Sequence, residues 1–353
     1  MKICFLVPDL DTNGGWGRYA AELVTYAKQV GHEVGVLVEN SHTEGSKPIL
    51  RRDKGMLGSV FATHKYIKDY DIIYALDVYP HGIIAYLASI GLKKKLILGA
   101  LGTYAIAPLH SWRTGWLAKT IYRRADVIVA ISEYTKKQIL NSVPDVHIRV
   151  INPGIDLKKF LKPHFNSGEE FIIGVGALKY RKGYHISIPA FAKVANEYPQ
   201  LRYKVIGRQS DRNYFKLLQS LVKQYGVQGR VEFIEGISDD NLIKLYQQAR
   251  AFILTSVNHN FHFEGYGIVF LEAASAGTPC VGTKNNGIVD AMKDEYNGFL
   301  VPQNNMDATA DALRKLLSND ELWQVMSKNG LDFVRDYDFA VKQKLFEKLY
   351  LAL

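Results

Sequence analysis

Short apolar runs recur along the whole chain and alternate with stretches of helical periodicity. Each run is rich in valine, isoleucine and leucine with little polar alternation, which is typical of parallel strands covered on both faces. Strands that alternate with helices indicate repeated strand–helix–strand units, so the sequence predicts an α/β fold. The runs are Lys2–Val7, Glu33–Val38, Ile72–Asp77, Leu96–Ala100, Val127–Ser132, His147–Asn152, Phe171–Gly176, Tyr203–Gly207, Val231–Glu235, Ala251–Ser256, Pro279–Thr283 and Gly298–Pro302.

The runs fall into two groups, and 353 residues are too many for one ordinary domain. A polar segment at 162–169, with Pro163 and Gly168, indicates the joint between them. We therefore expect a first domain of residues 1–165 and a second that begins at residue 166. Ligands of open parallel sheets bind at the carboxyl ends of the strands, so the expected site is the cleft between the two sheets.

Composition and cysteine usage narrow the class of protein. No run of about 18 apolar residues could span a membrane. The amino-terminal run is followed by Asp9 and Asp11 without a small-residue cleavage site, so we expect a buried first strand and not a signal peptide. Cys4 and Cys280 lie in apolar runs and form no close-spaced motif, which indicates buried thiols in a reducing cytoplasm.

The net charge of +9 is concentrated in the first half of the chain. Residues 1–165 hold 22 lysine and arginine residues against 14 aspartate and glutamate residues, whereas residues 166–353 hold 22 against 21. The excess predicts an anionic partner, such as a phospholipid surface, a pyrophosphate lipid or an acidic glycan. Basic loops that only aid solubility are the alternative. Nucleic acid is not expected, because no basic helix alternates with exposed aromatic residues.

The segment from Glu264 to Glu272 places two carboxylates, with seven residues between them, at the predicted start of a helix. Gly265 and Gly267 let a ligand approach the main chain, and the free N–H groups of a first helical turn face an anion. Glu272 would lie about two turns inside, roughly 12 Å further along the axis. This arrangement suits a nucleotide diphosphate sugar, which carries phosphate in the middle and hydroxyl groups at both ends.

A glycine-rich loop follows the first predicted strand. Gly14, Gly15 and Gly17 free backbone amides to approach a phosphate or a sugar. Glu39 ends the second strand, as in a dinucleotide-binding domain. The glycine spacing differs from Gly-x-Gly-x-x-Gly, so an NAD-dependent oxidoreductase is the weaker interpretation.

A second loop, Gly176–Gly183, holds three cationic side chains at the end of a strand. Lys179, Arg181 and Lys182 could clamp a diphosphate, with Lys182 the best placed. Because this loop and Gly265–Gly267 should share one edge of the same sheet, the clamp is favoured over a solvated loop. Ser238 is followed by Asp239 and Asp240. A helix N-cap with acidic residues in the first turn fully accounts for these three residues.

Two other kinds of site fit less well. His259 and His262 near Glu264 suggest a metal site, but no third ligand stands at a fixed spacing, so we expect no metal. Glu264 and Glu272 are too far apart for a glycosidase pair, whose carboxylates lie about 5–9.5 Å apart.

In their order and spacing, the motifs of this chain resemble those of the family 4 glycosyltransferases, also called group 1 transferases, which have the GT-B fold. The resemblance covers nearly the whole chain. It implies two Rossmann-like domains that face each other across a cleft. It also implies that a final helix, Tyr337–Leu353, returns to the first domain. The nucleotide-sugar domain then comprises residues 166–336. The motifs are Gly14–Tyr19, Ala125–Thr135, Val150–Asp156, Glu264–Glu272 and the segment from Gly287 to Pro302.

The resemblance implies a role for each matching residue. Glu272 should bind the ribose of the donor, and Glu264 the transferred sugar. Lys182 should hold the diphosphate, so Glu264 and Lys182 are the expected catalytic residues. The other residues expected to bind the donor are Gly15, Lys179, Arg181, Ile237 near the base, Asp239, Gly265, Tyr266, and the main chain of Gly267, Ile268 and Val269.

Members of this family transfer a sugar from a nucleotide diphosphate sugar, here UDP- or GDP-linked, with retention of anomeric configuration and without a metal or other cofactor. The leaving phosphate is thought to deprotonate the acceptor, which requires a lysine and a helix N-terminus to stabilise the departing pyrophosphate. The resemblance implies a glycan or lipid-linked acceptor and a place in cell-surface polysaccharide or glycolipid synthesis.

Two departures from the family pattern bear on activity. Ala177 stands where many members have arginine, and Leu101 replaces the histidine of a Val-His-Gly-Thr motif. Leu101 keeps open a non-catalytic nucleotide- or glycan-binding descendant, and an epimerase of the same fold is a further alternative. Glu264 and Glu272 are both present, which favours a transferase.

The acceptor side is expected in the first domain. A basic segment at 110–124 carries Trp112 and Trp116 and, with Arg51–Lys54, could lie on an anionic inner membrane leaflet, which predicts a cytoplasmic, peripheral protein. A sheet-covering helix with an exposed basic face is the alternative. The expected acceptor-side residues are Gly14, Trp16, Arg18, Gly102 and Thr103.

Overall fold

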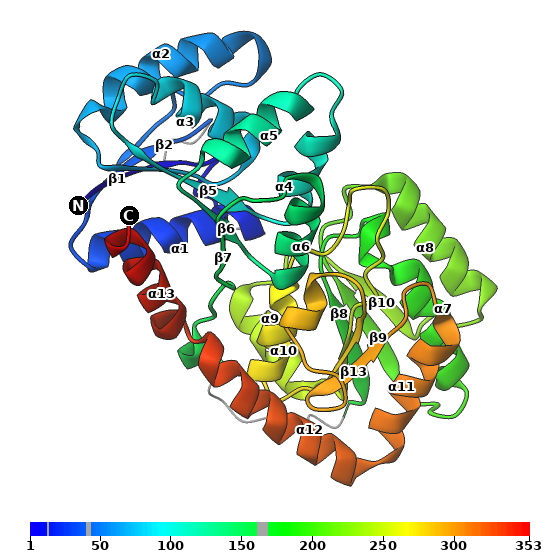
Figure 1. Cartoon of the computed structure of the whole chain (residues 1–353). Coiled ribbons are helices and arrows are strands. Elements are labelled where there is room, and N and C mark those ends of the chain that lie inside the picture. Colours follow the sequence, from blue (N-terminus) through cyan, green and yellow to red (C-terminus); the bar gives the residue numbers. More distant parts are fainter. Residues whose placement is uncertain (13, 40–43, 161–168) are drawn as a thin grey trace. The chain divides into compact units, whose positions relative to one another are not determined.

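The computed structural model describes residues 1–12, 14–39, 44–160 and 169–353, and the chain divides into two compact units (Figure 1). Unit 1 comprises Met1–Pro153 and Ala340–Leu353, and unit 2 comprises Gly154–Phe339. The predicted joint at 165 and 166 lies outside the described residues, and the division falls earlier. The main chain of Ile155 explains this, because it bonds to Tyr337 and Phe339 of unit 2 at 2.8 and 3.0 Å.

Unit 1 is built on a seven-stranded parallel sheet with the order β3-β2-β1-β4-β5-β6-β7. All six predicted strands of this half are present, and a two-residue strand, β3, extends the edge. Cys4, in the middle of β1, is fully buried as expected. The strands are β1 (Lys2–Leu6), β2 (Glu33–Leu37), β3 (Ser46–Lys47), β4 (Ile72–Ala75), β5 (Lys95–Ala100), β6 (Val127–Ala130) and β7 (Ile148–Val150).

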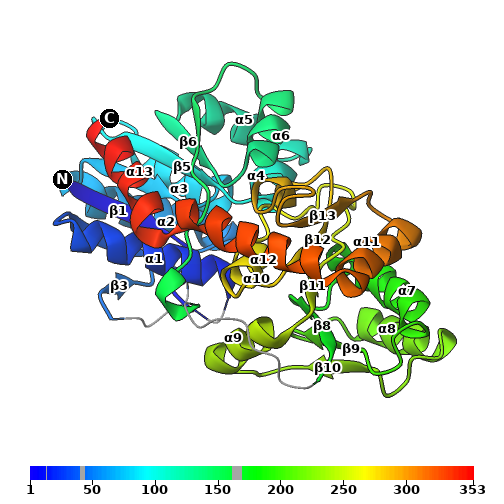
Figure 2. The same ribbon diagram turned by 90° about the horizontal axis from the view of Figure 1, so that it is seen from below.

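Helices cover both faces of this sheet (Figures 1 and 2). The terminal helix α13 lies beside α1, where Tyr26 donates to Glu347 at 3.4 Å, so the end of the chain packs in unit 1. On the other face, α3 lies between α2 and α5. The helices are α1 (Gly15–Gln29), α2 (Met56–Tyr66), α3 (Ile83–Ala88), α4 (Thr103–Ile106), α5 (Gly115–Arg124), α6 (Glu133–Ser142) and α13 (Phe339–Leu351), with short turns at Asp53–Gly55, Ile67–Asp69, Val78–Gly82 and Ala107–His110.

A buried charge cluster joins the carboxyl ends of β2 and β4. The ring nitrogens of fully buried His81 lie 2.7 Å from Asp77 and 3.0 Å from Glu39, and Arg52 donates to Glu39 at 2.9 Å. Burial lowers the pKa of His81, but the two carboxylates outweigh it and raise that pKa to about 9. Glu39 is therefore engaged by protein cations, which accounts for an acidic residue at this strand end without a dinucleotide.

Unit 2 contains a six-stranded parallel sheet with the order β10-β9-β8-β11-β12-β13. Each predicted run of the second half forms a strand, and Cys280 is fully buried in β12. The expectation of two parallel α/β domains is confirmed. The strands are β8 (Phe171–Val175), β9 (Arg202–Ile206), β10 (Val231–Ile234), β11 (Ala251–Ile253), β12 (Cys280–Thr283) and β13 (Gly298–Val301).

Two layers of helices enclose the sheet of unit 2 (Figure 1). α7 packs with α8 and α11 on one face, and α10 packs with α9 and α12 on the other. The helices are α7 (Tyr184–Ala195), α8 (Arg212–Gln224), α9 (Asp239–Gln248), α10 (Ile268–Ser275), α11 (Met306–Ser318) and α12 (Asp320–Phe333), with short turns at Leu157–Lys159, Tyr180–Lys182, Gly287–Asp290 and Val334–Tyr337.

Unit 1 should lose stability as the pH rises towards 9. The pKa of His81 in the folded chain, about 9, lies above its unfolded value of about 6.5. Its contribution is therefore complete below about pH 6.5 and is lost as the pH rises through about 9. His81→Gln should remove this dependence and, because Asp77 loses its buried cation, lower the free energy of unfolding by about 3 kcal/mol at pH 6.

Calorimetric unfolding between pH 6 and 10 measures both effects. His147→Gln is the matched control, because His147 is exposed. If His81→Gln kept the decline of the wild-type protein with pH, another group would be responsible for it.

Candidate functional site

Charged side chains gather in unit 2 where the adjacent strands β8 and β11 end. One carboxylate oxygen of Glu264, Oε2, lies 2.6 Å from Lys182 Nζ and 3.0 Å from an Arg181 guanidinium nitrogen. Ser256 Oγ donates to the same oxygen at 3.3 Å. The structure thus brings the predicted clamp and the first predicted carboxylate together, and it adds Ser256.

The electrostatics of this cluster favour a further anion. Burial raises the pKa of Glu264, but Lys182 and Arg181 outweigh it and lower that pKa to about 2, so the carboxylate is ionised. Burial also lowers the pKa of Lys182, and Arg181 and Lys179 lower it further, although Glu264 opposes this. Two cations beside one carboxylate leave an uncompensated positive charge, which a diphosphate would neutralise.

Glycines set the path of the clamp loop. Gly183 is left-handed, with φ +71°, and an added Cβ would lie 1.8 Å from Thr255 O. Thr255 in turn donates its hydroxyl to Gly183 O at 2.7 Å. At Gly176 an added Cβ would come within 3.2 Å of the Lys182 side chain. The loop therefore packs tightly on the end of β11, and a side chain at Gly176 would press against Lys182.

Helix α10 begins later than the sequence predicts. Gly267 is its N-cap residue and is left-handed, with φ +87°, so the first helical residue is Ile268. Gly265 and Gly267 therefore precede the first turn instead of lining it. Glu272 lies about one turn inside the helix, not two, which at 1.5 Å per residue is about 6 Å from its start. Partly buried Ile268 and Val269 supply the free N–H groups at this end.

Tyr246 holds the second carboxylate. This fully buried tyrosine on α9 donates its hydroxyl to Glu272 Oε2 at 3.0 Å. Sequence reasoning missed Tyr246, because an aromatic residue on an amphipathic helix indicates only a core position. It missed Ser256 for a similar reason: a serine that closes an apolar strand carries no signal of the carboxylate it meets.

The loop after β12 braces the Glu264 segment from behind. Gly287 N donates to Glu264 O at 2.8 Å, and an added Cβ at Gly287 would lie 2.0 Å from Gly265 O. The motif residue Gly287 thus has a packing role beside the site. Any larger residue would push the Glu264–Gly265 main chain away.

The other predicted donor residues that belong to unit 2 lie around this edge with different exposure, whereas Gly15 lies in unit 1. Tyr266 is buried and its ring packs near Tyr337, so only its main chain could meet a ligand. Lys179 is exposed at the start of the clamp turn. Ile237 is partly buried before α9, and exposed Asp239 begins that helix, whose cap Ser238 accepts from Asn241 N at 3.4 Å as expected.

His259 and His262 bond to each other through their main chains, each N–H donating to the other carbonyl at 2.9 Å. Glu264 is bound by cations and does not join them. In the part of the chain that the structure describes, no group of three or more His, Cys, Asp or Glu residues could hold a metal ion.

The predicted acceptor-side residues occupy two strand ends of unit 1. Gly14 caps α1 after β1, and Trp16 and Arg18 follow in its first turn, with Arg18 Nε donating to Thr12 O at 3.2 Å. Gly15, a predicted donor residue, is the first residue of the same turn. Asn13, of the same loop, lies outside the described residues. Gly102 and Thr103 follow β5 and begin α4, next to buried Leu101.

Comparison with known proteins matches both halves of the chain to glycosyltransferase families. The family model described as glycosyl transferases group 1 matches residues 157–333, and the model of glycosyltransferase family 4 matches residues 13–159. A D-inositol 3-phosphate glycosyltransferase of Corynebacterium urealyticum is 30% identical over 58% of this chain. A GDP-mannose-dependent alpha-(1-6)-phosphatidylinositol monomannoside mannosyltransferase of Mycobacterium tuberculosis is 25% identical over 65%. The matched parts span 51% and 64% of those two proteins.

Solved structures match over the full length. HepE of Anabaena, solved in complex with UDP, superposes with a TM-score of 0.86 at 20% identity and covers 100% of both chains. A sucrose-phosphate synthase of Thermosynechococcus elongatus superposes with a TM-score of 0.81, again at 20% identity and with 100% of both chains covered. These likenesses establish the fold.

Glu264→Gln should lower the free energy of unfolding of unit 2 by about 3 kcal/mol at pH 7, because Lys182 loses its buried counter-charge. The folded pKa of Glu264, about 2, lies below the unfolded value of about 4.3. The stabilisation is therefore present above about pH 4.3 and is lost as the pH falls towards 2. The difference between wild type and variant should shrink accordingly.

Denaturant unfolding at pH 7 and pH 3 measures this. Glu232→Gln, at an exposed position on β10, is the matched control and should change the unfolding free energy by less than about 0.5 kcal/mol. Equal stability of Glu264→Gln and wild type at pH 7 would contradict the assignment.

Proposed function

Because this chain is a member of the glycosyl transferases group 1 family, with the GT-B fold, we propose that its donor is a UDP- or GDP-linked sugar. The observation that carries the proposal is the ionised Glu264, held by two cations beside the start of α10. Lys182, Arg181 and the free N–H groups of α10 are suited to a diphosphate. Glu272, positioned by Tyr246, is suited to the ribose hydroxyls.

The proposed reaction is a transfer with retention of configuration. The bond between the anomeric carbon and the diphosphate oxygen breaks, and a bond from that carbon to the acceptor oxygen forms on the same face. The acceptor proton passes to the leaving diphosphate. Lys182 and the start of α10 stabilise the charge that develops on the leaving group, and Glu264 binds hydroxyls of the transferred sugar. No metal or other cofactor takes part in this proposal.

The names of similar proteins indicate two donor classes, and both are to be tested. The mycobacterial relative is named as GDP-mannose-dependent, whereas Anabaena HepE was solved with UDP and with UDP-glucose. The proposed acceptor is a glycan or a lipid-linked glycan, and the proposed process is synthesis of cell-surface polysaccharide or glycolipid.

A second candidate function is a nucleotide- or glycan-binding protein without turnover. Leu101 favours it, because this buried aliphatic residue supplies no hydrogen bond at the end of β5. Ala177 similarly adds no charge to the clamp, although Lys179 and Arg181 lie nearby in the same loop. The intact pair of Glu264 and Glu272 favours the transferase.

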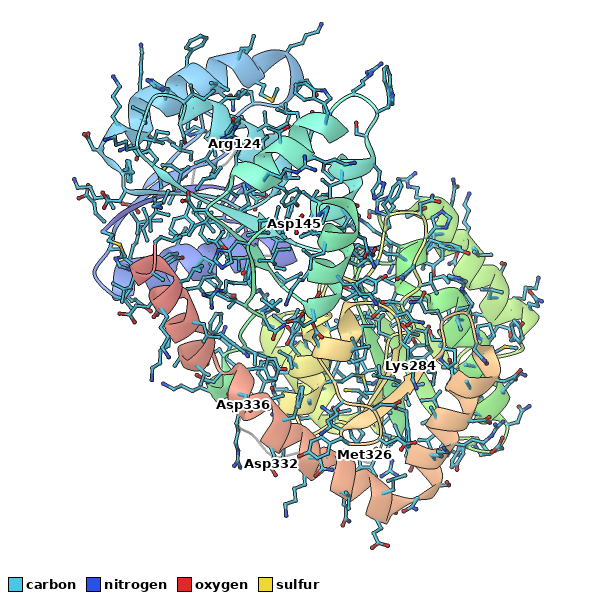
Figure 3. All side chains as sticks on the ribbon, in the orientation of Figure 1. Arg124, Asp145, Lys284, Met326, Asp332 and Asp336 are labelled. Carbon is cyan, nitrogen blue, oxygen red and sulfur yellow. The ribbon has the colours of Figure 1, made fainter. Side chains whose placement is uncertain are left out.

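The acceptor side of unit 1 is proposed to lie on an anionic membrane surface. Trp112 and Trp116 are 84% and 68% exposed at the start of the α5 region. Basic residues accompany them, among them Arg113, Lys119 and, at the end of α5, Arg124 (Figure 3). Exposed indole rings flanked by cations suit the interface of an anionic leaflet. Among the described residues, none of the helices combines the length and the hydrophobicity that a membrane span requires.

A thermal-shift assay tests the donor class. The ligands are UDP, GDP, ADP, dTDP and NAD⁺, each at millimolar concentration in the presence of EDTA. One nucleoside diphosphate should stand out, because a ligand at about 100 times its dissociation constant adds about 2.7 kcal/mol of stability. Tyr246→Phe should lower the affinity for this nucleoside diphosphate about fivefold, because Glu272 loses the hydrogen bond that positions its carboxylate. No response to any diphosphate would contradict the proposal.

Release of the free nucleotide from the matching nucleotide sugar then separates the two candidate functions. Turnover that is lost in Glu264→Ala supports the transferase. Tight binding without release of nucleotide supports the binding protein.

Vesicle sedimentation tests the membrane surface. The protein should sediment with vesicles that contain anionic lipid at low salt and should be released by high salt, because each basic residue near the surface contributes about 1 kcal/mol. Trp112→Ser combined with Trp116→Ser should reduce the bound fraction severalfold. Val325→Ser, which removes an exposed apolar side chain of unit 2, is the control. Equal sedimentation with neutral and anionic vesicles, or none, would exclude this surface.

A further inference from the structure

Two aromatic rings from distant segments meet at the carboxyl-terminal edge of the unit 1 sheet. Trp16 lies in the first turn of α1, after β1, and Tyr104 is the second residue of α4, after β5. Their ring centroids are 4.3 Å apart and their planes are inclined by 30°. Tyr104 is 55% exposed. Trp16 is partly buried, so the pair forms an aromatic surface of which the Tyr104 ring is the exposed part.

The space beside this pair is open main chain. An added Cβ at Gly14 or Gly15 would meet nothing within 4 Å. Gly102 adopts φ 62° and ψ −126°, a backbone conformation that glycine adopts without strain, and this turns the chain directly into Tyr104. Bare backbone thus lies in sequence next to each ring, where amide groups can hydrogen-bond a polar ligand that packs on the aromatic surface.

The pair presents ring surface and not its indole N–H. Trp16 Nε1 is buried and has no hydrogen-bond partner among the described residues. Leu101, the residue before Gly102, is buried and aliphatic. A ligand at this strand edge therefore meets aromatic faces and main-chain groups. A pyranose ring has matching chemistry: its C–H face packs on aromatic carbon, while its rim of hydroxyl groups bonds to peptide groups.

We propose that Trp16 and Tyr104 form a stacking platform for a pyranose ring of the acceptor. This rests on the proposed function, because it supplies unit 1 with the sugar-binding surface that a glycosyl acceptor requires. A single exposed aromatic residue would need no explanation. Here the rings of two residues 88 positions apart pack against each other, beside glycines, at the edge where parallel sheets bind ligands.

Saturation-transfer NMR tests the platform with methyl α-D-glucopyranoside, methyl α-D-mannopyranoside and methyl β-D-galactopyranoside, in the presence of the nucleoside diphosphate that binds best. Sorbitol, which carries similar hydroxyl groups but has no ring, is the control ligand. The wild-type protein should transfer saturation to the ring C–H protons of at least one glycoside. Tyr104→Phe, which keeps the ring, should retain this transfer, whereas Tyr104→Ala and Trp16→Leu should reduce it about fivefold.

Equal transfer in wild type and Tyr104→Ala, transfer to sorbitol alone, or no transfer to any glycoside would overturn the proposal. The thermal shift by the nucleoside diphosphate should be unchanged in Tyr104→Ala, because the side chains proposed to hold the diphosphate and the ribose, Lys182, Arg181 and Glu272, belong to unit 2. A shift absent from the wild-type protein would instead contradict the proposed function, so the two failures are distinguishable.

One further comparison separates acceptor from donor sugar. If the platform held the sugar of the donor, Tyr104→Ala would lower the affinity for the intact nucleotide sugar more than the affinity for the free nucleoside diphosphate. We expect Tyr104→Ala to leave the binding of both unchanged. A selective loss of the nucleotide sugar would overturn the acceptor assignment.

Discussion

The ion pair between Glu264 and Lys182 is the interaction on which the candidate site depends. It joins the loops after β8 and β11, which are 82 residues apart in the sequence, at the edge of unit 2. Arg181 and Ser256 share the same carboxylate oxygen, so the position of Glu264 is fixed from several sides. Two cations held by one buried, ionised carboxylate form a rigid cluster. Their surplus positive charge can bind a further anion.

A second buried cluster, in unit 1, uses the same chemistry to a different end. Asp77 and Glu39 are matched there by His81 and Arg52, so two negative charges meet two positive ones. Such a closed set has no charge left for a ligand, and it serves to hold the ends of β2 and β4. The contrast explains why only the unit 2 cluster is assigned to diphosphate binding.

The two units differ in the chemistry of their strand ends. Unit 2 provides charge, free helical N–H groups and a carboxylate positioned by Tyr246, which suit the anionic and ribose parts of a nucleotide sugar. Unit 1 provides glycine main chain and the Trp16–Tyr104 pair, which suit a neutral sugar ring. Membership of the group 1 transferases is consistent with this division of chemistry between the domains.

The strands could be predicted from the amino-acid sequence, because the apolar runs of a parallel sheet are a local property of the chain. The sequence also predicted that the clamp loop and Gly265–Gly267 would share one edge of the same sheet. It did not predict the ion pair that Lys182 and Glu264 form there. Tertiary structure decided the rest. The left-handed Gly267 moved the start of α10 to Ile268, and contacts between distant segments brought Tyr246 to Glu272 and Tyr104 to Trp16. Such contacts depend on how whole helices and strands pack, and no local pattern of residue types encodes that packing.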